Sequence, residues 1–249
     1  MTTGLLVNGL DLVAGAVVRD LVQARHSALD VWREVRRYDP PAQAALYAAH
    51  QVLKHARDPA HTALATVAPG RAGSPEMFQW VRRIEAGWGR ERAGDAIRMN
   101  PVHTLHAVDN LALSALSLAI GARGFGVGLG GAPGQAWSAL DLLAQRIRQG
   151  PEVEGLVFAG DQADAEAGGA VCGVALLFAR GGTRPDAVAR VSWDRSQPEV
   201  TEPDRDVTVG LATLWQKVQH HSRAPRWGIL LPPTLVDGRT GLLVRGELP

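Results

Sequence analysis

The chain has 249 residues, of which 46% are hydrophobic, 20% charged and 5% aromatic, a composition typical of a globular protein with one substantial core or two small ones. Because 26 basic residues are balanced by 25 acidic ones, the net charge of +1 excludes the basic surface that nucleic acid or an anionic membrane needs. One cysteine, Cys172, excludes a disulfide framework and a multi-cysteine zinc site, and the lack of a long apolar stretch or a leader peptide indicates a soluble, cytoplasmic protein.

Short apolar runs alternate along the chain with helical patterns, in which apolar residues recur at intervals of three and four. In chain order, the sequence predicts a strand at 5–12, a helical stretch from 21 that Pro40 and Pro41 divide, a second helix at 42–56, a strand at 62–68, helices at 78–84 and 105–120, a strand at 125–129, a helix at 135–149, strands at 156–159, 171–178 and 187–193, a helix at 207–220, and strands at 228–231 and 242–244. This alternation is typical of an α/β fold in which helices cover a largely parallel or mixed sheet.

Three of these segments have a composition that indicates burial. The helix at 105–120 carries leucine and alanine on every side, and such a helix is buried in a core or against another subunit. The strands at 156–159 and 171–178 are continuously apolar, as expected for strands that are buried on both faces.

The glycines that follow the helix predicted at 105–120 have the spacing of a dinucleotide-binding turn, Gly126-x-Gly128-x-x-Gly131. That site requires the turn to open a helix directly, and it requires an acidic residue about 20 residues further on, at a strand end. Here no helix begins at once, and Glu152 and Glu154 follow a helix. Close packing of the backbone explains these glycines better.

Nucleophilic chemistry has two candidate residues. Ser138 is not in the Gly-x-Ser-x-Gly turn that serine hydrolases use, and a place in the first turn of a helix explains it better. Cys172 lies inside an apolar strand, where burial raises the pKa of a thiol, and we predict that it is a core residue.

The histidines suggest a metal site only weakly. His103, His106 and Asp109 share a helical face, but a further ligand is missing nearby, so structural histidines are the favoured interpretation. His220 and His221 are adjacent and point in different directions, which favours a solvated helix end. We therefore expect neither a metal nor a cofactor.

The segment from Asn100 to Asp161 resembles the N-terminal half of the β-ketoacyl synthases, which belong to the thiolase superfamily. In that family an apolar helix precedes a glycine-rich turn and a short strand, then comes a nucleophile at the start of a buried helix, and then a strand that ends in Ala-Gly and an acidic or polar residue. The matching parts of this chain are residues 105–120, 121–129, 135–149 and 156–161.

Gln135 stands where the resemblance places the catalytic cysteine. An amide cannot carry an acyl thioester, so the resemblance implies a dead nucleophile position and a pseudoenzyme. In this respect the chain resembles the chain length factors, which typically carry glutamine at this position. Chain length factors are the inactive partner subunits of type II polyketide synthases. The His-Gly-Thr-Gly and Asn-x-Phe-Gly motifs of the family's catalytic C-terminal half do not occur in the sequence.

The resemblance implies a thiolase-like half with a truncated C-terminal half, in an α/β fold whose mixed, mostly buried sheet is covered by helices. We expect a single domain, residues 1–249, in which 200–249 form a divergent C-terminal extension. In its short length the chain resembles the chain-length-factor-like proteins of aryl polyene pigment systems.

The expected function is non-catalytic: the chain would dock on a full-length β-ketoacyl synthase subunit, or on a second copy of itself, and would bound the acyl tunnel. An acyl carrier protein would be an indirect partner. The expected tunnel residues are Leu113, Leu116 and Ile120, although a core role is the better interpretation for any one of them. The expected dimer interface consists of Leu105, Val108, Asn110, Phe125 and Val127.

Two alternatives stay open. The chain could be a homodimeric module that binds an acyl carrier protein or acyl-CoA without a synthase. It could also be an enzyme of the acyltransferase or β-ketoacyl synthase class, active only in a complex or through Ser138 or His106.

Overall fold

The computed structural model describes residues 9–27, 33–68, 82, 110–130, 135–162, 169–197, 208–221, 226–231 and 241–247. In this part of the chain the strands are β1 (Leu10–Val18), β2 (Ala63–Ala68), β3 (Gly126–Gly130), β4 (Glu154–Gln162), β5 (Val171–Ala179), β6 (Ala189–Gln197), β7 (Arg226–Leu231) and β8 (Gly241–Glu247). The helices are α1 (Leu21–Ser27), η1 (Arg33–Arg37), α2 (Pro40–Leu53), η2 (Pro59–His61), α5 (Leu111–Ile120), α6 (Gln135–Gln149) and α7 (Val209–His221).

The described strands form one mixed, eight-stranded sheet in the order β3-β2-β4-β5-β1-β6-β8-β7. β2 lies parallel to β3 on one side and to β4 on the other, while β5 is antiparallel to both β4 and β1. β6 joins the far side of β1, and β8 and β7 continue the sheet with antiparallel pairing. The last three described strands, β6, β7 and β8, therefore extend the same sheet.

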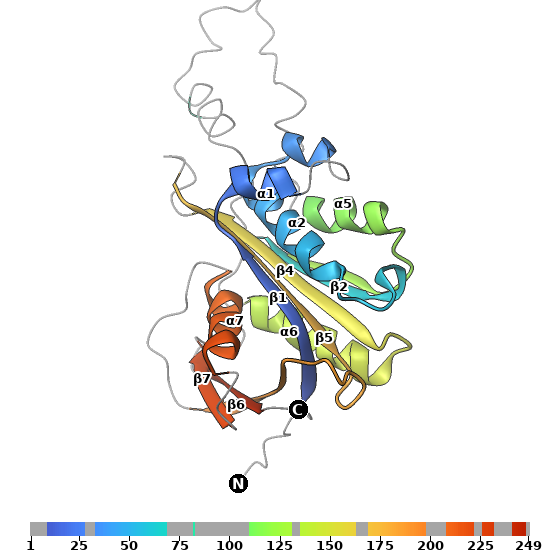
Figure 1. Ribbon diagram of the computed structural model, residues 1–249, viewed down its shortest axis with the longest axis vertical. Coiled ribbons are helices and arrows are strands. Elements are labelled where there is room, and N and C mark those ends of the chain that lie inside the picture. Colours follow the sequence, from blue (N-terminus) through green and yellow to red (C-terminus); the bar gives the residue numbers. More distant parts are fainter. Residues whose placement is uncertain are drawn as a thin grey trace, which may run out of the picture.

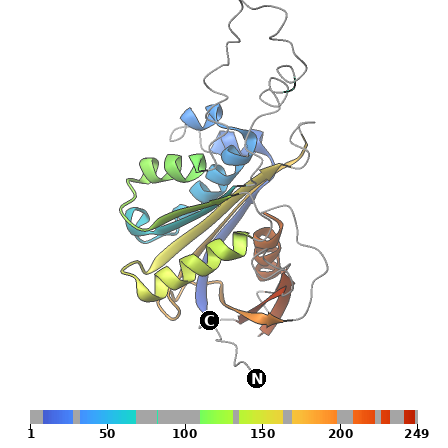
Figure 2. The ribbon, with the colours of Figure 1, turned by 180° about the vertical axis from the view of Figure 1, so that it is seen from behind.

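Helices cover both faces of the sheet, so the molecule has three layers (Figures 1 and 2). On one face, α1, α2 and α5 pack on a cluster that includes Leu64, Leu156 and Phe158. On the other face, α6 and α7 pack on a cluster that includes Val157 and Phe178. β4 is buried along its whole length, which explains its continuously apolar sequence.

Helix α2 lies close to the sheet because small residues meet at the contact. Its sheet-facing side carries buried alanines, among them Ala44 and Ala45, and the opposing position on β4 is Gly160. A Cβ on Gly160 would lie 2.7 Å from the carbonyl carbon of Pro41, well inside van der Waals contact. The side chain of any other residue would therefore push α2 away from the sheet.

The α/β fold predicted from the sequence is confirmed, and most predicted elements occur within a few residues of their expected bounds. The first strand differs, since it runs over Leu10–Val18 rather than 5–12. The helix predicted at 105–120 is described as α5 from Leu111, and residues 105–109 lie outside the described residues. The helical stretch predicted from residue 21 is in fact α1 and η1, two short pieces before α2. Apart from Arg82, the helix predicted at 78–84 lies outside the described residues.

Candidate functional site

Several polar residues gather at the edge of the sheet where β1, β2, β3 and β4 all end, which we call the carboxyl edge. β2, β3 and β4 are parallel, and β1 points the same way as β4 because both are antiparallel to β5. Helix α6 begins shortly after β3 ends, and the first turn of α2 lies against Gly160 near the end of β4. In open α/β sheets ligands bind beyond the carboxyl ends of the strands, so this edge is the candidate site.

Gln135 is the first residue of α6. It is half-buried, and its amide oxygen Oε1 is fully buried without a hydrogen-bond partner among the residues that the structure describes. The helix is held against the sheet from its first turn, because Ala136 and Trp137 are both buried. The chain thus places Gln135 at the start of a helix with one buried face, while its role as a dead nucleophile position stays a prediction.

Asp161 and Cys172 face each other across β4 and β5 at the same edge. Directly paired residues project from the same face of a sheet, and alternation from Val157 and Val174 makes this the face covered by α6 and α7. Asp161 is buried, with its carboxylate accepting a hydrogen bond of 2.7 Å from the backbone N–H of Gln162.

The prediction that Cys172 is a core residue is wrong. The strand assignment is correct, but Cys172 is the second residue of β5, and the first two residues of that strand are only half-buried. Burial becomes complete from Gly173 onward. The apolar pattern of the sequence does not reveal where the helical cover of a strand begins.

Helix α5 is only partly covered within this chain, so burial on every side in the chain's own core is excluded, while burial of its exposed side against another subunit stays a prediction. Leu116 is fully buried in the cluster beneath α2 and α5, and Leu113 and Ile120 are half-buried beside it. Leu118 is 84% exposed on the opposite side. The three proposed tunnel residues therefore lie on the inward side of α5, and their tunnel role stays a prediction.

The predicted interface residues that the structure describes lie along β3, the edge strand. Phe125 and Val127 are half-buried and pack on the cluster under α6, and the Arg146 guanidinium lies 5.6 Å from the centre of the Phe125 ring. Asn110 lies over the other face of the strand, where a Cβ on Gly128 would lie 2.6 Å from the Asn110 side-chain carbon. Leu105 and Val108 lie outside the described residues.

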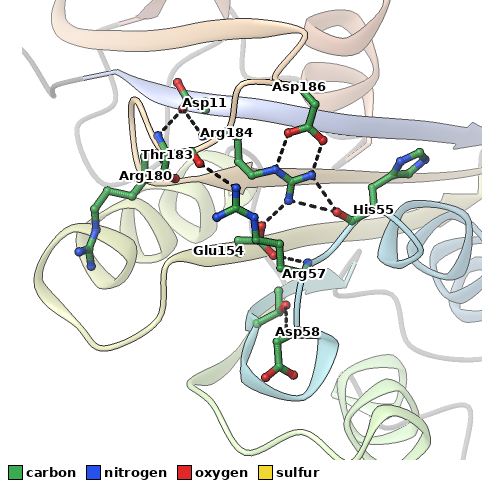
Figure 3. A network of polar contacts seen from close by, with 10 residues as sticks. Asp11, His55, Arg57, Asp58, Glu154, Arg180, Thr183, Arg184 and Asp186 are labelled. Atoms are coloured by element: carbon green, nitrogen blue, oxygen red, sulfur yellow. Dashed lines mark hydrogen bonds and ion pairs between the residues drawn. The ribbon is translucent and has the colours of Figure 1, made fainter.

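The opposite edge of the sheet holds a second polar cluster, which Figure 3 shows. Arg184 is buried and bonds to Glu154, to Asp186 and to the backbone carbonyl of His55. Glu154 also accepts a hydrogen bond of 2.8 Å from the backbone N–H of Arg57. The cluster therefore joins the turn after β5 to the segment between α2 and η2, and it is structural.

Asp11 ties the same turn to β1. Its carboxylate is fully buried and accepts hydrogen bonds from the backbone N–H groups of Gly182, at 2.7 Å, and Thr183, at 3.2 Å. Arg190 donates to its other oxygen at 3.2 Å. All the charged groups of this cluster that the structure describes are therefore used within the fold.

The pKa directions agree with this structural role. A hydrogen bond from Arg184 lowers the pKa of Asp186 to about 2, and its contacts with Asp186 and then Glu154 raise the pKa of Arg184 despite the opposing effect of burial. Burial favours a higher pKa for Glu152, but hydrogen bonds from Arg146 and from the backbone of Phe125 outweigh it and lower the pKa.

The structure also bears on the alternative chemistries. Gly126 and Gly128 lie within β3 rather than in a turn, and Glu152 and Glu154 are engaged in ion pairs, so the dinucleotide-binding pattern lacks its geometry. Ser138 is half-buried in the first turn of α6, as predicted.

The histidine predictions are tested only in part. His220 is exposed at the end of α7, as expected for a solvated helix end. His103, His106 and Asp109 lie outside the described residues. Within the described ranges, no three residues of metal-binding type form a group, and no helix is long and apolar enough to span a membrane.

Sequence reasoning did not find the Arg184 cluster or the pairing of Asp161 with Cys172. A signal for the first was present, since Asp11 and Glu154 are acidic residues at the start of otherwise apolar runs. Buried acidic residues need a cationic or hydrogen-bonding partner. Their partners come from a turn far along the chain, which no local pattern predicts.

No family model matches the chain, and no curated protein matches it. Solved structures do resemble it. A chain of the complex between the ketosynthase ApeO and its chain length factor ApeC from Xenorhabdus doucetiae aligns over 96% of this chain and 99% of its own length, with a TM-score of 0.57 and 12% identity. A β-ketoacyl synthase from Burkholderia phymatum aligns over 97% and 100%, with a TM-score of 0.64 and 10% identity.

The ishigamide ketosynthase/chain length factor structure is also similar, over 85% of this chain and 74% of its own, with a TM-score of 0.55 and 12% identity. At such low identities the likeness shows the fold, which is that of the thiolase-like ketosynthases. The aligned spans of the first two structures reach nearly the whole of each chain. They therefore reach into residues 200–249, which the sequence analysis describes as a divergent C-terminal extension.

Proposed function

We propose that the chain is a non-catalytic, chain-length-factor-like partner of a β-ketoacyl synthase in polyketide or fatty-acid-like biosynthesis. The observation that carries this proposal is Gln135, an amide at the start of α6 at the carboxyl edge, in a fold shared with ketosynthases and chain length factors. A helix N-terminus can activate a thiol, but it gives an amide nothing beyond hydrogen bonds.

The second support is an uncovered surface that we call the β3–α5 surface, formed by β3 and the exposed side of α5. Among the described residues β3 pairs with β2 alone, so no described residue pairs with the backbone groups of its outer edge. On α5, Leu118 is 84% exposed, on the side of the helix opposite the buried Leu116. Unpaired strand edges and exposed apolar side chains are typical of surfaces that bind a partner.

The proposed partner is a full-length ketosynthase subunit, which would meet the chain through this surface and receive acyl groups from an acyl carrier protein. The ketosynthase and chain length factor named in the similar complex from Xenorhabdus doucetiae support such a pairing. A cytoplasmic location and a place in an aryl polyene type of pathway are part of the same proposal.

Association is tested by co-expressing the chain with the synthase encoded beside it and recording native mass spectra. The Leu118→Arg variant is expected to weaken the complex at least about tenfold, because a charge replaces an exposed apolar side chain of the β3–α5 surface. Val22→Arg is the matched control, since Val22 is also exposed, at 62%, but lies on α1.

The outcomes separate the proposals. A heterodimer that Leu118→Arg weakens and Val22→Arg leaves intact supports the ketosynthase partner. A homodimer that ignores the synthase supports the acyl-binding module instead. A chain that stays monomeric in both experiments contradicts the proposed function.

Chain-length control is tested separately in the intact complex. Leu113→Ala and Ile120→Ala are expected to shift the product to longer chains, because tunnel depth depends on side-chain volume. Leu116→Ala should in addition cost about 3 kcal/mol of stability, since Leu116 is fully buried. Mass spectrometry of the products measures the shift, and unchanged products from both half-buried variants would show that the tunnel assignment is wrong.

A further inference from the structure

Strand β3 has little to hold it in place within the sheet. Its sequence alternates glycine with an apolar residue (Gly126, Gly128 and Gly130 against Val127 and Leu129), and glycine loses more conformational freedom on folding than any other residue. Among the described strands β2 alone pairs with it, and none of its residues is fully buried. A strand of this kind opens locally at a low free-energy cost unless other contacts support it.

The backbone that β3 turns to its outer edge is that of the glycines. Leu64 of β2 pairs with Gly126 and donates its N–H to the carbonyl of Phe125 at 2.8 Å. Backbone groups of successive residues point alternately to the two sides of a strand, so Phe125 and the two apolar residues of β3 bond toward β2. The three glycines therefore present their N–H and C=O groups to a partner. The most flexible backbone of the strand lies where the proposed partner would bind.

Glu152 supports β3 at the point where the strand starts. It lies between α6 and β4 and is only 6% exposed. Its carboxylate accepts hydrogen bonds from the backbone N–H of Phe125, at 2.9 Å, and from Nε of Arg146, at 2.7 Å. Phe125 directly precedes β3, and its carbonyl accepts the bond from Leu64. Glu152 thus fixes the residue with which the pairing between β2 and β3 begins.

Arg146 completes this group, which we call the β3 clamp (Phe125, Arg146 and Glu152). The Arg146 guanidinium lies 5.6 Å from the centre of the Phe125 ring, so the cation that pairs with Glu152 also contacts the ring. The ring packs on the cluster beneath α6. Because Glu152 is buried within the chain, it can influence a partner only through the order of β3.

We propose that Glu152 is a positioning residue for partner binding, which keeps β3 in the conformation that the partner recognises without touching the partner. This inference rests on the proposed function and adds a residue that controls the β3–α5 surface from inside the chain. An interface that is already ordered loses less conformational entropy on binding. When the competent conformation is only partly populated, the apparent affinity falls by the populated fraction.

The test compares the rates at which the full chain binds to and leaves the synthase encoded beside it, measured by surface plasmon resonance. Glu152→Ala is expected to slow association about tenfold and to leave dissociation within about twofold, because the partner holds β3 once the complex has formed. Leu118→Arg removes a proposed direct contact and should mainly speed dissociation. Glu152→Gln keeps an acceptor for the Phe125 N–H and should restore most of the association rate.

Hydrogen exchange of the free chain measures the order of β3 without a partner. In Glu152→Ala the amides of Val127 and Leu129 are expected to exchange about tenfold faster, while the amides of the interior strand β4 keep their rates. Glu154→Gln is the matched control, because it changes another buried carboxylate two residues away that pairs with Arg184 instead. It should change neither the exchange of β3 nor the association rate.

Slower association with unchanged dissociation, restored by Glu152→Gln, supports the positioning role. The role is overturned if Glu152→Ala associates as fast as the parent chain, if its main effect is faster dissociation, or if exchange rises equally in β3 and β4. If Glu152→Ala does not fold, Arg146→Met decides instead, since its 38% exposed side chain can be replaced more safely and should slow association about threefold. A parent chain that binds no synthase contradicts the proposed function itself, and the positioning role with it.

Discussion

Replacing Arg184 with methionine is expected to lower the free energy of unfolding by about 3–5 kcal/mol. The side chain is buried, and its removal leaves the Glu154 carboxylate buried without its cationic partner. The turn after β5 would also lose its link to the carbonyl of His55. Chemical denaturation of the variant and of the parent chain measures the loss.

Arg57→Met is the matched control, because its exposed guanidinium donates to one backbone carbonyl, that of Thr183, and should contribute less than about 1 kcal/mol. The double variant Arg184→Met, Glu154→Gln should recover part of the loss, since no buried charge is then left unpaired. Equal losses in Arg184→Met and Arg57→Met would contradict a buried ion pair.

The decrease in the free energy of unfolding at acid pH provides an independent control for Arg184→Met. The pKa of Asp186 is lowered to about 2 in the folded chain, mainly by the hydrogen bond from Arg184. The stability from this contact is present above the unfolded pKa of about 4 and is lost as the pH falls through about 2. In Arg184→Met the pKa returns toward its ordinary value, so this part of the acid dependence should disappear.

Replacing Gly160 with alanine is expected to destabilise the chain by about 3 kcal/mol. The new methyl group would collide with the backbone of Pro41, and backbone cannot rotate away as a flexible side chain can. Helix α2 would have to move as a body and would lose its contacts with β4 and β5. Thermal or chemical unfolding detects the effect.

The control is Gly126→Ala on β3, where the nearest atoms to a Cβ are methyl groups of Leu113 at 3.9 and 4.0 Å. This ordinary contact should leave stability within about 0.5 kcal/mol of the parent chain. A small effect at Gly160 would mean that α2 does not sit as close to the sheet as the structure shows.

Elements with a complete local pattern could be predicted from the sequence. Leu140, Leu143 and Ile147 recur on one side of α6, and each of them is fully buried in the structure. β2 is an apolar run between turn signals, and the structure places it over Ala63–Ala68, one residue inside the predicted range. In both segments the local pattern and the tertiary packing agree.

Elements that depend on distant neighbours could not be predicted. Ala14, Gly15 and Ala16 have little preference for a strand, yet they lie in β1 because β5 pairs with them. The half-exposure of Cys172 has the same origin, since it depends on how far the helices extend over the sheet. The Arg184 cluster depends on contacts between residues more than a hundred positions apart, such as His55 with Arg184.

At the carboxyl edge, the sequence located Gln135 at a helix start through the family resemblance, and the structure has the helix begin there. It did not predict that Asp161 and Cys172 meet at this edge, because that contact needs the register between β4 and β5. Register is fixed by pairing across the whole sheet and has no local signature.

The place of β1 in the sheet has a consequence for how the protein is made. β1, the first described strand of the chain, lies between β5 and β6 in the sheet. Asp11 therefore has pairing partners on both sides only after the ribosome has added Ala179 and Arg190. At ribosomal rates of roughly 5–20 residues per second, the delay until Arg190 is made is about 9–36 s. Throughout it the nascent chain exposes an apolar segment without its hydrogen-bonding neighbours, and efficient production in a host cell should therefore depend on chaperones that shield this segment during translation.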